Sequence, residues 1–124
     1  MSGIVPGKFI ERMGAIHRRI EAALPASAPR HVFFSAYDTE VVPGVGTMPV
    51  DNLDAVAVQG DAVFRGEDFV SQTLHSPTFL ELALLANQAI IETKSFHYPF
   101  FEGVHRSEES TKDGIPIYDL AMGF

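Results

Sequence analysis

The segment SFHYPFFEGVHRSEES, residues 95–110, is rich in aromatic side chains and ends in a charged run. Its aromatic-rich composition predicts a strand from Phe96 to His105. Successive side chains of a strand point to opposite sides, so every second residue shares a face. One face would carry Phe96, Tyr98, Phe100, Glu102 and Val104. We expect this aromatic row to be buried in the core or in a subunit contact.

The closing segment IPIYDLAMGF, residues 115–124, repeats the same two-residue period. Its row consists of Tyr118, Leu120 and Met122. Between the two segments, Asp113 and Gly114 form a typical turn dipeptide. The pattern therefore predicts an antiparallel strand pair at the end of the sequence. Because Ile115 and Ile117 lie opposite that row, neither face of the second strand looks exposed to solvent.

Two stretches have the periodicity of helices. In residues 7–24 apolar side chains recur at steps of three and four, which predicts an amphipathic helix. A second helix should run from Pro77 to Lys94 and is apolar around most of its circumference, so it must be covered on several sides. It could start with Ser76 as N-cap. Alternatively, Thr78 and Glu81 could form a capping box.

The remaining segments suggest short strands. Residues 31–37, HVFFSAY, are rich in strand-forming side chains, and residues 54–66 alternate around a turn at 59–61, as in a hairpin. Residues 67–75 are expected to form a short helix. Strands and helices thus occur in runs and not in strict alternation, which is typical of the α+β class. We predict a mainly antiparallel sheet with the N-terminal amphipathic helix and the central apolar helix packed on it.

The composition and charge of the sequence exclude some classes of function. The 124 residues suit one globular domain, residues 1–124, and the net charge is −7. Residues 1–30 hold five basic and two acidic side chains, whereas the remainder holds four basic and fourteen acidic ones. The strongly acidic residues 31–124 would repel the phosphate backbone of a nucleic acid, so we expect no nucleic-acid partner. No apolar run is long enough to cross a bilayer and no signal peptide is visible, so we expect no membrane association and a cytoplasmic location.

The sequence favours neither a metal nor a cofactor. Cysteine is absent. His97 and His105 would share a strand face, but eight residues of extended chain separate them by roughly 26 Å, and one zinc ion cannot bridge that distance. Gly44 and Gly46 form a lone G-x-G without the context of a dinucleotide site. We expect no bound metal and no cofactor.

Two classes of function remain open. The first is a protein-interaction or assembly domain that self-associates as a homo-oligomer, or binds another protein. Its candidate interface residues are Phe100, Tyr118, Leu120 and Met122. The second is a small-ligand-binding protein or small enzyme with a pocket under the loop of residues 38–52. Its candidate lining residues are His31, Tyr37, Asp38, His75 and His97. No recognisable catalytic constellation decides whether the protein is an enzyme, and we expect the first class.

Overall fold

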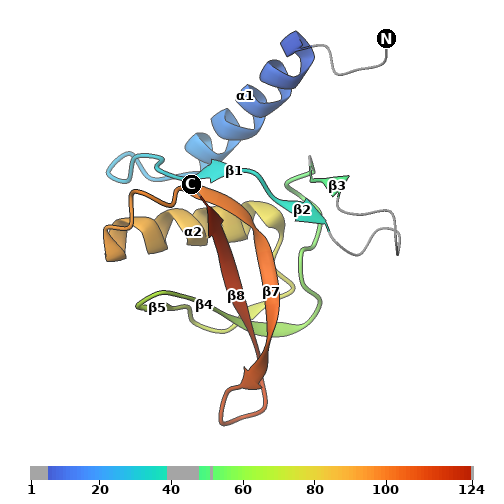
Figure 1. Ribbon diagram of the computed structural model, residues 1–124, viewed down its shortest axis with the longest axis vertical. Helices are drawn as coiled ribbons and strands as arrows, with labels where there is room; N and C mark the ends of the chain where they lie inside the picture. Colours follow the sequence, from blue (N-terminus) through green and yellow to red (C-terminus); the bar gives the residue numbers. More distant parts are fainter. Residues whose placement is uncertain (1–5, 39–47, 51, 124) are drawn as a thin grey trace.

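The computed structural model describes residues 6–38, 48–50 and 52–123 (Figure 1). Two helices and a mixed six-stranded sheet confirm the α+β class. The elements in chain order are α1 (Pro6–Ala23), β1 (Phe33–Phe34), β2 (Tyr37–Asp38), β3 (Met48–Pro49), β4 (Asp61–Gly66), β5 (Phe69–Val70), β6 (Leu74–His75), α2 (Phe79–Thr93), β7 (Phe100–Ser110) and β8 (Pro116–Gly123).

The sheet is mixed, so the expectation of a mainly antiparallel sheet was wrong. Its strand order is β1-β7-β8-β4-β5, with β6 also paired to β4. The pairs β1–β7 and β4–β8 are parallel, whereas β7–β8, β4–β5 and β4–β6 are antiparallel. Both parallel pairs join strands that are far apart in sequence, and local periodicity contains no information about such pairing. A separate two-stranded pair, β2–β3, is antiparallel.

The hairpin expected over residues 54–66 is not formed. Only its second half is a strand, β4, and this strand pairs with β5, β6 and β8. The backbone of the first half bonds instead to the start of α2. The Ala57 N–H donates to the Pro77 carbonyl at 2.8 Å, and the Phe79 N–H donates to the Ala55 carbonyl at 3.1 Å. Contacts distant in sequence have thus replaced the local hairpin.

The short helix expected over residues 67–75 is also absent, because this segment forms β5 and β6. Asp68 has a φ of 56°, which turns the chain sharply from β4 into β5. The Ser71 hydroxyl accepts a hydrogen bond from the Phe64 N–H at 2.9 Å. The segment of residues 67–75 therefore forms its hydrogen bonds with β4 in the sheet, and not within a helix.

The antiparallel pair predicted at the end of the sequence is confirmed as β7–β8, but the assignment of faces on β7 was wrong. Phe101 is fully buried, whereas Phe96, Tyr98 and Phe100 are exposed. The strand starts only at Phe100. Phe101 and Gly103 pair with two adjacent residues of β8, Met122 and Ala121. Glu102, which lies between them on β7, therefore has no partner and is the extra residue of a β-bulge.

The bulge resets the alternation of side chains along β7. Phe101 pairs with Met122 and Val104 pairs with Leu120, and all four belong to the core or pack against it. In an unbroken strand, residues three apart would point to opposite faces. Gly103, next to the bulge, has a φ of 125°, a conformation that favours glycine.

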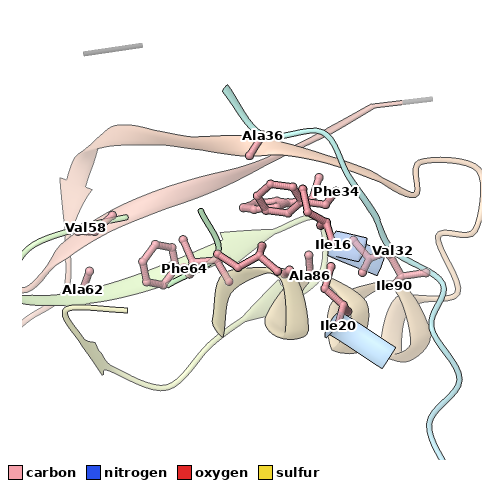
Figure 2. Packing of buried hydrophobic residues seen from close by; sticks show 14 residues of the cluster. Ile16, Ile20, Val32, Phe34, Ala36, Val58, Ala62, Phe64, Ala86 and Ile90 are labelled. Atoms are coloured by element: carbon pink, nitrogen blue, oxygen red, sulfur yellow. The ribbon is translucent and has the colours of Figure 1, made fainter. Parts of the chain in front are cut away.

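Helix α2 lies along one face of the sheet, and the core fills the space between them (Figure 2). Phe34 and Phe64 point into this space from β1 and β4. Thr78 is the N-cap of α2 and forms a reciprocal capping box with Glu81, so this start and not Ser76 is the one adopted. The capping box satisfies two of the backbone donors that every helix start leaves unpaired.

Among the side chains that the structure describes, helix α1 packs on the core through Met13, Ile16 and Ile20 (Figure 1). Ile16 and Ile20 are buried beside Val32 and Phe34. Arg19 and Asp54 form a bidentate ion pair, which ties the helix to the loop before β4. The orientation of α1 is therefore set at its end nearest β1.

Candidate interaction surface

The expected ligand-binding residues do not gather around one pocket in the described part of the chain. The His75 ring bonds to Asp61 at 2.8 Å, at the paired ends of β6 and β4. The His31 ring contacts the Phe96 ring, and His97 is exposed in the adjoining turn. Tyr37 and Asp38 form β2, and most of the loop expected to cover the pocket, residues 39–47 and 51, lies outside the described residues.

Three cavities border α2, and none of them is lined by His31, His75 or His97. Among residues 6–38, 48–50 and 52–123, no group of three or more histidine, aspartate or glutamate side chains could hold a metal ion. The Asp61–His75 pair is highly exposed, and a catalytic base oriented by a carboxylate needs a substrate pocket beside it. The pair therefore lacks the enclosure that would suggest catalysis.

The four candidate interface residues lie on two different faces. Tyr118, Leu120 and Met122 point toward α2 and are partly buried against the core. Phe100 is on the opposite face of the sheet, with 38% of its surface exposed. Its neighbours there were not recognised from the sequence, because they come from β1 and from the turn before β7.

A group of aromatic rings lies on this outer face, where β1 meets β7. The Phe33 ring stacks on the Phe100 ring with 5.3 Å between centroids. The His31 and Phe96 rings lie 5.0 Å apart. Along residues 31–36 the buried side chains are Val32, Phe34 and Ala36, so His31 and Phe33 share the opposite side. We call the four rings of His31, Phe33, Phe96 and Phe100 the aromatic patch.

The aromatic patch is held in place by groups around β1. The Arg30 guanidinium lies 4.9 Å from the centre of the Phe33 ring, and the His17 ring meets that ring edge-on. The buried Asn87 side chain accepts hydrogen bonds from the His31 and Val32 N–H groups, at 2.6 and 2.9 Å. The segment of residues 31–34, which carries two of the four rings, is thus fixed by contacts with both helices.

The same contacts occupy the free side of β1. The Val32 N–H is bonded to Asn87, and the Phe34 N–H donates to Nε2 of His17 at 3.0 Å. The neighbouring Phe33 and Ser35 N–H groups bond to Pro99 and Phe101 on the β7 side. An edge whose donors are used in this way is a poor template for adding a further strand. The patch is therefore accessible by its face and not by its edge.

Further along the outer face lies an ionic cluster around Arg65. Arg65 bonds to Asp119 at 2.9 Å and also contacts Glu109 and Ser107. The bonds to the two carboxylates raise the pKa of Arg65 above its usual value. This cluster, on β4, β7 and β8, is internally paired.

His17 makes the stability of the α1–β1 contact dependent on pH. Its Nε2 accepts the Phe34 N–H and must be unprotonated to do so. Burial, and then the nearby Arg30, lower the pKa of His17 below 6.5, with a smaller opposing effect of Glu21. A lowered pKa in the folded state means that the stability conferred by the neutral ring is present above the unfolded value and is lost as the pH falls through the folded value.

We therefore expect the wild-type protein to lose stability relative to the His17→Gln variant as the pH falls from 7.5 to 5. Glutamine does not titrate, so the difference between the two proteins removes the contributions of the other four histidines. Urea unfolding at a series of pH values measures the difference in the free energy of unfolding between the two proteins. A difference that stayed constant, or that grew in favour of wild type at acid pH, would contradict a neutral His17.

Comparison of the chain with protein-family models, with curated proteins and with solved structures found no significant match. No helix in the described part of the chain is long and apolar enough to cross a membrane. Function must therefore be argued from the surface and the cavities of the protein itself.

Proposed function

We propose that the protein is a self-associating interaction domain, in which the aromatic patch of one copy packs on the same patch of a second copy. The observation that supports this is the gathering of four aromatic rings, three of them exposed, beside a strand that contacts with both helices hold in place. Phenylalanine rings are enriched at interface centres, and grouped exposed apolar side chains are typical of binding sites. A rigid patch also loses little conformational freedom when it binds.

A two-fold contact is favoured by the charges on either side of the patch. On one side lie α1 and Arg30, from the first thirty residues, which hold five basic and two acidic side chains; Arg30 is itself paired with Glu21. On the other side the Glu102 carboxylate lies close over Gly123 of β8. A two-fold axis parallel to the strands would set the basic side of each copy against the acidic side of the other. Such a contact uses the same surface twice, as isologous dimers do.

Light scattering after gel filtration tests the proposal. We expect wild type to show a mass near twice 13.6 kDa at tens of micromolar. The double variant Phe33→Ser, Phe100→Ser should have the mass of a monomer, because it removes the stacked pair at the centre of the patch. More salt should weaken the dimer modestly, since exposed ion pairs contribute only about 0.2–1 kcal/mol each.

Val70→Ser is the matched control. Val70 is 66% exposed on β5, at the opposite edge of the sheet, and the change likewise replaces exposed apolar surface by a hydroxyl. We expect its mass to equal that of wild type. Circular dichroism should show that all three proteins are folded. A monomeric wild-type protein at 100 micromolar, or a Val70 variant that dissociates as fully as the double variant, would refute assembly through the patch.

A further inference from the structure

A cavity of about 280 Å³ lies between the C-terminal half of α2 and the inner face of the sheet. Its apolar wall includes Phe69, Leu120 and Met122, and its polar wall includes Glu67, Thr93 and Tyr98. An apolar protein cavity of about 150 Å³ can hold benzene. This cavity therefore has room for one aromatic ring with a short chain attached.

The polar groups around the cavity carry more negative than positive charge. Glu67, in the turn between β4 and β5, is the one charged residue of the lining. The C-terminal end of α2 lines the same cavity through Thr93, and the C-terminal end of a helix carries partial negative charge. Lys94, the C-cap of α2, has an exposed side chain and is not part of the lining. A cationic group is thus favoured there over an anionic one.

The polar wall also offers contacts to such a group. The Thr93 hydroxyl donates to the Ala89 carbonyl at 2.7 Å and lies 2.9 Å from the Ser95 hydroxyl, so its orientation is set. Tyr98 places an aromatic ring at the cavity, and aromatic faces attract cations. An apolar wall with a few placed polar groups is the usual composition of a small-molecule site.

We propose that this cavity binds a small arylalkyl amine, with the ring against Phe69, Leu120 and Met122 and the ammonium group between Glu67 and the end of α2. The site shares no residue with the aromatic patch, and its apolar wall belongs to the inner face of the sheet. The protein would then combine an assembly surface with a separate small-molecule site.

Titration with three probes that share a ring tests the charge preference: phenethylamine, 2-phenylethanol and 3-phenylpropionate. Calorimetry on the wild-type protein measures affinity, and the ¹³C-methyl resonance of Met122 reports whether the probe enters the cavity. We expect phenethylamine to bind about threefold more tightly than the alcohol and at least about tenfold more tightly than the carboxylate, as partly screened charges allow. Equal affinities, or no binding by millimolar phenethylamine, would overturn the proposal.

Two variants locate the site. Ala89→Leu places a larger side chain at the lining and should reduce phenethylamine binding at least tenfold. Glu67→Gln should reduce it about threefold while leaving 2-phenylethanol unchanged. Glu108→Gln is the control, because it removes the same charge from an exposed position on β7 outside the cavity lining. Undiminished binding by Ala89→Leu, or a Met122 methyl resonance that does not move at saturation, would show that the amine binds elsewhere.

Discussion

Phe101→Ala is expected to lower the free energy of unfolding by about 3–5 kcal/mol, the usual cost of truncating a buried phenylalanine. Phe101 is fully buried, contacts the Phe34 ring and pairs with Met122 across the sheet. Removing the ring leaves a cavity where β1, β7 and β8 meet. Domains of this size are stable by about 5–15 kcal/mol in total, so the variant should be marginally folded.

Phe100→Ala is the matched comparison, because it removes the same side chain one residue earlier on the opposite face. Phe100 is 38% exposed and stacks on Phe33, so we expect a loss of about 1 kcal/mol. Urea unfolding below the concentration at which the protein associates measures both. A larger loss for Phe100→Ala than for Phe101→Ala would mean that the register of β7 is shifted by one residue.

Asn87→Leu is expected to cost about 2–5 kcal/mol, because it leaves one buried and one partly buried N–H group without an acceptor. Asn87 is 1% exposed. Its side-chain oxygen accepts from the His31 and Val32 N–H groups, and its nitrogen donates to the Pro29 carbonyl at 3.2 Å. One side chain of α2 thereby satisfies three backbone groups of the segment that leads into β1. Leucine keeps the branching of asparagine at Cγ but is larger and cannot accept a hydrogen bond, so the loss combines the missing hydrogen bonds with overpacking.

Gln88→Leu provides the control. Gln88 is the next residue of α2, is exposed, and bonds to Glu92 at 3.3 Å. Its replacement should change the free energy of unfolding by less than about 0.5 kcal/mol. Because Asn87 positions β1, its variant should also weaken self-association, measured by light scattering at a temperature where the protein remains folded. Equal effects of the two substitutions on stability would show that the Asn87 hydrogen bonds contribute nothing.

Local patterns in the sequence were sufficient for the helices and for the last two strands. Apolar steps of three and four predicted a helix over residues 7–24, and the capping box at Thr78 and Glu81 was one of the two starts considered for α2. The Asp113–Gly114 turn joins two strands that are adjacent in sequence, β7 and β8. Each of these features depends on interactions between residues close together in the chain, so each produces a recognisable local pattern in the sequence.

The candidate interaction surface could not be predicted in this way. Asn87 interrupts an apolar helix without belonging to the polar stripe of Glu81, Gln88 and Glu92, and that was the one signal of its buried role. The cavity on the inner face of the sheet collects residues from β5, α2, β8 and the turns beside them. No spacing along the chain connects such residues.

The sequence by itself thus determined the α+β class, the two helices and the closing hairpin, whereas tertiary contacts decided the direction of strand pairing and which residues face outward. Residues 55, 57 and 60 bond to residues 76–79, around the start of α2, and a bulge at Glu102 brings Phe101 and Val104 to the same side. The aromatic patch exists because β1 pairs with β7. Hydrogen bonds and burial between distant segments outweigh local propensity in a sheet, since a strand is stabilised by its neighbours and a helix largely by its own residues.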